Sequence, residues 1–250
     1  IHLEGGFRAL LGENIMLDNI IATGEEITVQ NAARFTLRNS DVFDVVNETP
    51  VGDQTTWQPH LNRKGGAYIN GVEGLLLENN FFDHNGWAEG YDYNLAGSKP
   101  MPPSMYSHNF YLDASNADLT FRDNITMRGA SFGVQVRSGG FIEDNAIIDN
   151  NAAINFYGGN YLGAGAVGNY TLLLGNVITS ASYKRVAMAE GALSYGIEDG
   201  GRQSSLIGNI VAHLADPNNA AEQALKAGAH FAYKPGHETY FNDTMIYNWQ

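Results

Sequence analysis

A short phrase recurs along this chain: an apolar residue, two mostly polar residues, an Asn, and then one or two more apolar residues. The copies are LDNII, LENNFF, FRDNI, IEDNAII, LLGNVI and LIGNIV, which end at Ile21, Phe82, Ile125, Ile148, Ile178 and Val211. Asn124 and Asn145 lie 21 residues apart, and the same spacing separates Asn19 from Ser40. The 44 residues from Asn80 to Asn124 make about two such periods. A fixed period of this length, filled with short apolar runs, indicates a β solenoid.

One coil of a right-handed parallel β-helix needs about this many residues, because it holds two or three short strands joined by turns. An Asn at the same place in each coil has a physical use, since it can adopt the left-handed bend and its amide can bond to the next Asn in the stack. The sequence therefore predicts an all-β fold, a single-stranded right-handed parallel β-helix of roughly eight coils. The coils take about 21 to 33 residues each, with long loops over one face.

Composition narrows the classes of partner. The chain has 27 acidic and 14 basic residues, a net charge of −13, and no Cys. This charge opposes binding of nucleic acid or an anionic membrane, and no apolar run is long enough for membrane insertion. Without Cys there are no disulfides and no thiol catalysis, which fits an exported bacterial or phage protein as well as a cytosolic one.

Residues 1–250 are predicted to form one domain, because no segment has the composition of a linker. The end of a solenoid normally needs a capping segment, and residues 1–8 are short for one. We therefore expect that further coils precede Ile1 in the native protein. The oligomeric state is left open by the sequence. Because no signal peptide opens the chain, the sequence itself is silent on export.

Two long excursions interrupt the predicted coils, at residues 47–66 and 83–107. Loops of this length in a compact repeat are usually functional. The second loop runs directly into the strand HNFYLD, residues 108–113, and we expect it to overhang one face of the solenoid. It brings His84, Trp87 and Lys99, and His108 lies at its exit, while Lys64 belongs to the first loop.

Strand alternation predicts which side chains line that face. If apolar residues point inward, the outward residues of successive coils are Tyr68 and Asn70, then Asn109, Tyr111 and Asp113, then Gln135 and Arg137, then Asn155 and Tyr157. Thr28 and Gln30 continue this face on one side, and Ser194 and Glu198 on the other. Aromatic and amide groups around one Arg are typical of a surface that binds a sugar chain.

Structural explanations compete with each of these assignments. An Arg at a strand end is often a solvated surface residue. A His near a turn often bonds to the backbone, which applies to His84 and His108. Tyr111 and Tyr157 also suit a strand because aromatic residues favour β structure. Trp87 would either stack on a sugar or pack within its loop.

The segment GASFGVQVRSGGFIEDNAIIDN, residues 129–150, is similar to the part of alginate lyases and chondroitinase B that carries an Arg before a V-x-x-N turn. Nearly the whole chain resembles right-handed parallel β-helix proteins of the pectate lyase-like superfamily. This resemblance maps the catalytic Arg of those lyases onto Arg137. Those lyases place a catalytic Lys on the preceding coil, whereas HNFYLD has none, and the Asp-Pro-His signature of alginate epimerases is missing. The resemblance is therefore stronger for the fold than for the catalytic groups.

These observations predict a secreted or extracellular polysaccharide lyase that cleaves a uronic-acid-containing polysaccharide by β-elimination. Arg137 would neutralise the sugar carboxylate, His108 or His84 would act as the base, and Tyr111 as the acid or a second base. The residues expected to bind the polysaccharide are Tyr68, Asn70, Trp87, Asn109, Gln135, Asn155, Tyr157, Lys64 and Lys99.

No cofactor is required by this chemistry, and no metal site is predicted. Ca²⁺ could take over part of the role of Arg137, with Asp83, Glu89 or Asp92 as oxygen ligands.

Two alternatives belong to other classes. An inverting glycoside hydrolase would pair Asp113 with Asp83, Glu89 or Asp92 across the scissile bond. A non-catalytic, tailspike-type β-helix would use the same Trp and Tyr residues only to hold a glycan.

Overall fold

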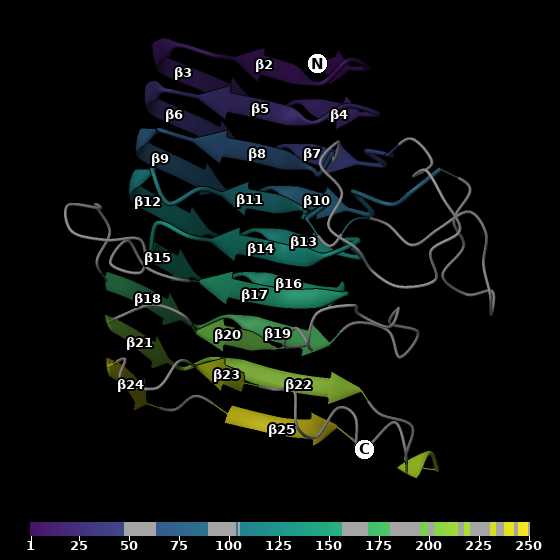
Figure 1. Cartoon of the computed structure of the whole chain (residues 1–250), viewed down its shortest axis with the longest axis vertical. Helices are drawn as coiled ribbons and strands as arrows, with labels where there is room; N and C mark the ends of the chain where they lie inside the picture. The colour runs from purple at the N-terminus through teal and green to yellow at the C-terminus, as the bar shows by residue number, and fades with distance from the viewer. Residues whose placement is uncertain are drawn as a thin grey trace.

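The computed structural model describes residues 1–47, 64–89, 104, 106–156, 170–180, 196–199, 203–214, 218–220, 231–233, 238–242 and 245–249. Within this part of the chain, every paired strand is parallel to its neighbours and the strands stack into one elongated solenoid (Figure 1). No helix in the described residues is long and apolar enough to cross a membrane.

Three parallel sheets run along the solenoid, and each coil contributes one strand to each sheet. Sheet A contains β1 (His2–Leu3), β4 (Ile21–Thr23), β7 (Asp41–Phe43), β10 (Phe81–Asp83), β13 (Ile125–Met127), β16 (Ala146–Asn150), β19 (Val177–Ser180), β22 (Ile210–Leu214) and β25 (Met245–Trp249). Sheet B contains β2 (Phe7–Ala9), β5 (Ile27–Gln30), β8 (Ala67–Asn70), β11 (Phe110–Leu112), β14 (Phe132–Val136), β17 (Ala152–Phe156), β20 (Ile197–Asp199) and β23 (Phe231–Tyr233). Sheet C contains β3 (Gly12–Asp18), β6 (Ala32–Arg38), β9 (Glu73–Glu78), β12 (Ala117–Arg122), β15 (Gly140–Glu143), β18 (Tyr170–Leu174), β21 (Gln203–Ile207) and β24 (Glu238–Asn242).

Strands β2 to β25 make eight coils of three strands, preceded by β1, which confirms the predicted all-β parallel β-helix of roughly eight coils. The 44-residue spacing was predicted to hold two coils, and this is wrong. β9 pairs directly with β12, so Asn80 and Asn124 lie on adjacent coils and the extra length is the 83–107 excursion. Both predicted excursions connect a sheet A strand to a sheet B strand.

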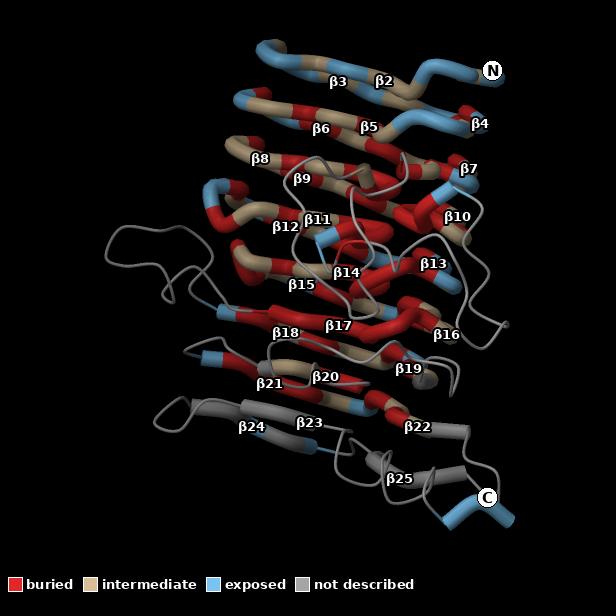
Figure 2. Tube along the Cα trace, turned by 45° about the vertical axis from the view of Figure 1, so that its right-hand side comes forward, coloured by how far each residue is buried: buried red, intermediate tan, exposed pale blue. Residues whose placement is uncertain are grey.

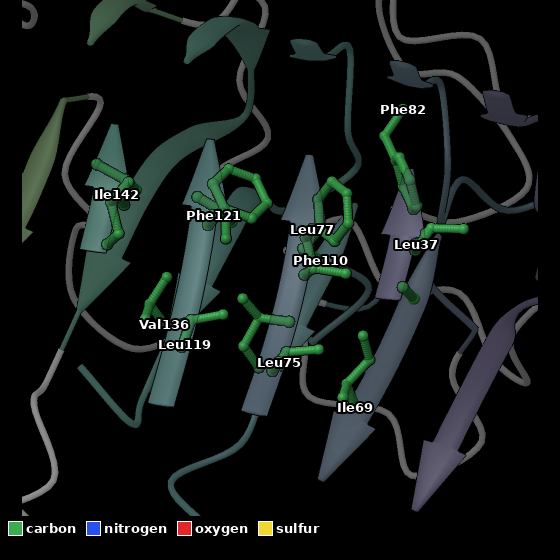
Figure 3. Close-up of a cluster of buried hydrophobic side chains, with 14 of the residues drawn as sticks. Leu37, Ile69, Leu75, Leu77, Phe82, Phe110, Leu119, Phe121, Val136 and Ile142 are labelled. Carbon is green, nitrogen blue, oxygen red and sulfur yellow. The ribbon is translucent and has the colours of Figure 1, made fainter. Parts of the chain in front are cut away.

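The core lies between the three sheets, where buried apolar residues alternate with more exposed ones along the strands of the middle coils. Figure 2 shows these buried positions following the solenoid from coil to coil. Phe82, Phe110 and Phe121 come one from each sheet and meet in the middle coils (Figure 3). The ring centroids of Phe82 and Phe110 are 3.7 Å apart, and Phe121 meets Phe110 edge to face at 5.0 Å. Truncating such a buried Phe to Ala typically costs about 3–5 kcal/mol, so this cluster holds β11 firmly in place.

A ladder of buried Asn side chains follows the turn from sheet C to sheet A. Its members, at most 2% exposed, are Asn80, Asn124, Asn145, Asn176 and Asn209. In each step the side-chain Nδ2 donates to Oδ1 of the next Asn at 2.9–3.1 Å. The same Nδ2 of Asn124 also donates to the carbonyl of Leu77, in the preceding coil. The predicted amide stack is therefore confirmed for these five residues.

The left-handed bend occurs one residue before the ladder, which corrects the prediction that the ladder Asn itself adopts it. The bend residues with φ of 51–55° are Asn19, Asn39, Asn79, Asp123 and Asp144, and all are exposed. Asn19 is therefore out of phase with Ser40: its N–H donates to the carbonyl of Arg38, and Ile20 holds the ladder position beside Ser40. Two separate residues are needed because one side chain must point to solvent and the other into the turn.

A second ladder, of alternating charge, runs across the outer face of sheet C. The register aligns Asp18, Arg38, Glu78, Arg122 and Glu143. Arg122 donates from Nε and Nη2 to Oε2 of Glu78 at 3.0 and 2.7 Å, and this hydrogen bonding raises the pKa of Arg122. The pKa of Asp18 is lowered by hydrogen bonds from Asn39 and Arg38. Opposite charges in register favour this alignment of the strands over a shifted one.

Candidate functional site

The outer face of sheet B carries two rows of side chains that run across the coils. The tyrosine row consists, in order of pairing, of Arg8, Thr28, Tyr68, Tyr111, Gln135, Asn155 and Glu198. The arginine row lies two positions later and consists of Gln30, Asn70, Asp113 and Arg137. The backbone N–H of Asp113 donates to Ile69 at 2.9 Å, and that of Arg137 to Leu112 at 2.8 Å, which extends the register beyond the strand ends. The predicted alignment is confirmed for Tyr68 and Asn70, for Tyr111 and Asp113, for Gln135 and Arg137, and for Asn155.

Tyr111 lies at the centre of a stack of rings. Its centroid is 5.3 Å from that of Tyr68, with 13° between the planes, and 5.6 Å from that of His108, with 10° between the planes. Because the ring of Tyr111 packs against these neighbouring rings, its hydroxyl-bearing edge is the part that can contact a ligand. The stack therefore favours recognition of a sugar by hydrogen bonds over stacking on the face of Tyr111.

The Tyr111 hydroxyl joins the two rows. Arg137 donates from Nη1 to this oxygen at 3.0 Å, and the hydroxyl donates to Oδ2 of Asp113 at 3.3 Å. Oδ1 of Asp113 accepts from the backbone N–H of Ser115 at 3.0 Å and from its hydroxyl at 2.8 Å. Asp113 is thus held by its own turn, and the phenolic oxygen lies between a cation and a carboxylate.

His108 lies beneath this cluster and is 2% exposed. The backbone N–H of Phe132 donates to its Nδ1 at 3.3 Å. Because Nδ1 accepts this bond, it carries the ring's lone pair, and the proton of the neutral ring is assigned to Nε2. In this tautomer Nε2 of His108 is a hydrogen-bond donor, and its ring buttresses Tyr111.

Two consecutive glycines allow the backbone of the preceding coil to approach His108. A Cβ on Gly65 would lie 2.2 Å from the carbonyl oxygen of His108, and one on Gly66 would lie 2.5 Å from that of Asn109. The N–H of Gly66 donates to His108 at 3.0 Å across this approach. The pair thus fixes the start of β11 and the position of the His108 ring.

His84 and Trp87 form a separate cluster after β10. Nδ1 of His84 lies 2.8 Å from Oδ1 of Asp44, and its ring stacks near Trp87 with centroids 6.0 Å apart. Trp87 was expected to be exposed in a loop, but it is 6% exposed and its indole N–H donates to the carbonyl of Arg128 at 2.7 Å. The packing explanation is therefore correct for Trp87, because burial and this bond occupy both its ring and its N–H.

Asn109 was predicted to point outward, and this is also wrong. β11 begins at Phe110, so strand alternation does not apply to Asn109, which lies in the preceding turn. It is fully buried, accepts from Asn85 at 2.9 Å and donates to Asn150 at 3.1 Å. Asn85, Asn109 and Asn150 thus form a second amide ladder, at the turn from sheet A to sheet B.

Other candidate residues are engaged in ion pairs. Nζ of Lys64 lies 2.7 Å from Oε1 of Glu25. Asp83, considered as a calcium ligand or a catalytic acid, accepts hydrogen bonds on both oxygens from Arg128, whose Nε lies at 2.7 Å. In the described part of the chain no three His, Asp or Glu side chains gather as a metal ion would require. Asp92, one of the three ligands considered for Ca²⁺, lies outside the described residues, so a role of Ca²⁺ stays a prediction.

Three of the predicted residues, Asp92, Lys99 and Tyr157, lie outside the described residues. The same is true of Ser194. Their roles remain predictions.

Asn155 is the least expected member of the tyrosine row. It is fully buried between the longer side chains of Gln135 and Glu198, and neither its amide nitrogen nor its oxygen has a hydrogen-bond partner among the described residues. A buried polar group without a partner costs about 1–3 kcal/mol. On the outer face of sheet B, a buried amide without a described partner is a candidate for contact with a ligand.

Sequence reasoning missed the residues that orient the cluster. The spacing D-x-S from Asp113 to Ser115 is a recognised signal for a side-chain turn, and the Gly65–Gly66 pair is a signal for close backbone approach. Neither signal reveals that the carbonyl of His108 is the group approached, because that contact joins residues more than 40 apart in the sequence.

Comparison with known protein families supports the architecture. The family described as the right handed beta helix region matches residues 1–171. Searches of curated proteins and of solved structures gave no match. The match covers more than half of the chain, including sheet B up to β17 and all of the Tyr111 cluster, so the chain belongs to the right-handed β-helix family.

Proposed function

We propose that this protein is a polysaccharide lyase that cleaves a uronic-acid-containing polysaccharide by β-elimination. One observation carries the proposal: Arg137 donates to the Tyr111 hydroxyl at 3.0 Å on the outer face of sheet B. Elimination needs a group that takes the proton from carbon 5 and a cation that neutralises the adjacent carboxylate. Tyr111 and Arg137 supply these two functions side by side.

Tyr111 acts as the base in this mechanism. Its hydroxyl proton passes to Asp113, to which it already donates, and Arg137 stabilises the phenolate that remains. The phenolate takes the proton from carbon 5, the C–H electron pair forms the double bond between carbons 4 and 5, and the bond from carbon 4 to the glycosidic oxygen breaks. Tyr111 then gives this proton to the leaving oxygen, and Asp113 returns the first proton to the Tyr111 phenolate, so the net change is one proton moved from carbon 5 to the leaving oxygen and the enzyme is restored.

Arg137 has a second role in the same step. A guanidinium carries five N–H donors in a planar fork, so it can bind Tyr111 and the sugar carboxylate together. The resemblance of residues 129–150 to the Arg-bearing segment of alginate lyases and chondroitinase B supports this role.

His108 is assigned to positioning and hydrogen-bond donation. With Nδ1 accepting from Phe132, the neutral ring cannot take a proton at Nε2, so this tautomer argues against the base role predicted for His108. Its ring keeps the plane of Tyr111 fixed.

Hydrolysis by two carboxylates receives less support. Asp113 and Glu198 are three coils apart, about 14 Å at the usual strand spacing, whereas an inverting pair is about 6.5–9.5 Å apart. Asp83 is bound to Arg128.

We further propose that the protein acts outside the cell, where a polymer of this kind is accessible.

The test is incubation with a panel of uronic-acid polysaccharides, with ultraviolet absorbance of the unsaturated product and new reducing ends measured on the same samples. Absorbance that rises with the wild type and is lost in Arg137→Ala and Tyr111→Phe supports elimination. Reducing ends without absorbance would indicate hydrolysis and refute the proposal. Binding without either product would indicate a glycan-binding protein and refute it too.

A further inference from the structure

The charges along the two rows of sheet B restrict which polymer can lie on them. The coils are about 4.8 Å apart, which is close to the length that one sugar adds to an extended chain. A polymer running along the tyrosine row therefore places about one sugar on each coil. The side chains of each coil then select the charge of the sugar above it.

Among the described residues of the two rows, Arg8 and Arg137 are the cations, and Asp113 and Glu198 are the carboxylates. Arg8 lies on the first coil, four coils before Arg137. Asp113 lies one coil before Arg137, and Glu198 lies two coils after it. A uronate fits on the Arg137 coil, where the guanidinium faces it. The coils on either side offer no described cation to a second or third uronate, and the coil of Glu198 carries a carboxylate.

Asn155 lies on the coil between Arg137 and Glu198. Both of its amide atoms lack a partner among the described residues, so it has one acceptor and two donor hydrogens to offer. Hydroxyl and acetamido groups match this set, because each can donate and accept. Rotation of the longer Gln135 and Glu198 side chains that flank it would open the way to its amide.

The net charge of the whole chain acts in the same direction. At −13 it repels a densely charged polyanion at long range, and the two guanidinium groups of the described rows, Arg8 and Arg137, do little to offset this.

We propose that the substrate is an unsulfated heteropolysaccharide in which each uronate is flanked by sugars without negative charge. This inference rests on the proposed function for the uronate at Arg137, but the charge preference itself is a property of binding. It excludes polymers with a carboxylate on every sugar and polymers with sulfated sugars.

The test compares binding of three hexasaccharides by calorimetry: an unsulfated one that alternates glucuronate with N-acetylhexosamine, its sulfated counterpart, and a galacturonate homopolymer. The wild type should bind the unsulfated alternating hexasaccharide at least about tenfold more tightly than either of the other two, which is the effect of one screened like-charge contact. In Glu198→Gln, the ratio of these dissociation constants should be smaller. Glu73→Gln is the matched control, since Glu73 is exposed on sheet C and the change in net charge is the same.

Equal or tighter binding of the homopolymer or the sulfated chain by the wild type would overturn the inference. So would an equal effect of Glu198→Gln and Glu73→Gln, or no binding of any of the three. Elimination is followed on the same ligands: a clear charge preference without unsaturated product would refute the lyase proposal and leave the binding inference standing.

Discussion

Among single residues, the proposed elimination depends most on Tyr111, whose hydroxyl contacts both Arg137 and Asp113. Tyr111→Phe removes this oxygen and keeps the ring between Tyr68 and His108. We expect kcat/KM for elimination to fall about 10²- to 10⁴-fold, the usual loss of an acid–base group, with little change in the unfolding midpoint.

Tyr68→Phe is the matched control for that variant. The Tyr68 hydroxyl accepts from Asn70 at 3.2 Å and takes no part in the proposed proton transfer, so this variant should keep most of the activity. Full activity in Tyr111→Phe, or an equal loss in both variants, would count against Tyr111 as the base.

The Asn ladder gives a prediction for stability. Oδ1 of Asn124 accepts from both the backbone and the side chain of Asn80, so Asn124→Ala leaves buried donors without a partner. The free energy of unfolding, measured by denaturant titration, should fall by at least about 1–3 kcal/mol.

The neighbouring residue provides the control. Asp123 is exposed and has φ of 55°, a conformation that Gly adopts without strain, so Asp123→Gly should change the free energy of unfolding much less. If both variants were equally destabilised, the ladder would not be the source of the effect.

Polarity and alternation were enough to predict Tyr68, Tyr111, Gln135 and Arg137 on one face, because strand geometry fixes the direction of alternate side chains. They failed for Asn109. An amide in a buried ladder has the same polarity as one that faces solvent, and only the hydrogen bonds to Asn85 and Asn150 distinguish the two.

At the scale of elements, strand β11 is positioned by the close approach of the preceding coil. Gly65→Ala would place a Cβ 2.2 Å from the carbonyl oxygen of His108, so the backbone must shift. We expect the variant to be destabilised by about 1–3 kcal/mol, as in other overpacked sites, and its elimination rate to fall because the His108 ring moves.

Gly5→Ala is the comparison for this prediction, since nothing lies within 4 Å of a Cβ at that position. Thermal unfolding and activity measured on both variants separate a local effect at His108 from a general effect of adding a methyl group. Unchanged stability and activity in Gly65→Ala would contradict the proposed role of this approach.

The sequence placed most turns correctly because the Asn phrase marks them, but it misplaced the first coil by one residue. In that coil Ile20 occupies the ladder position. The nearest Asn in the sequence is the left-handed Asn19, so the repeat was aligned on Asn19 instead. Two residues that share a turn and a residue type cannot be assigned to separate roles by spacing alone.

At the scale of the whole molecule, the solenoid is a stack in which each coil contacts its neighbours. Side chains of the first coil, such as Phe7 and Leu17, are only partly buried, whereas Phe110 and Phe121 are fully buried. Stability in such a stack is a sum of neighbour interactions, so amide hydrogens of β2 to β4 should exchange faster than those of β14 to β16. Hydrogen exchange followed by mass spectrometry measures this order, and uniform protection along the stack would contradict it.

The number of coils and the parallel architecture followed from the period, whereas the 44-residue interval was divided wrongly. A loop inserted into one coil and a second coil have the same effect on spacing. The pairing of β9 with β12 shows that the interval holds one coil with an inserted loop and not two coils. This pairing joins residues that only the folded chain brings together.

Elimination at Tyr111 and Arg137 can be distinguished from hydrolysis by mass balance on a defined oligosaccharide. Elimination gives two products whose masses sum to that of the substrate, and hydrolysis adds one water. We expect products without the added water, formed by the wild type and not by Arg137→Ala. Products that contain the added water, or cleavage that persists in Arg137→Ala, would contradict the proposed elimination.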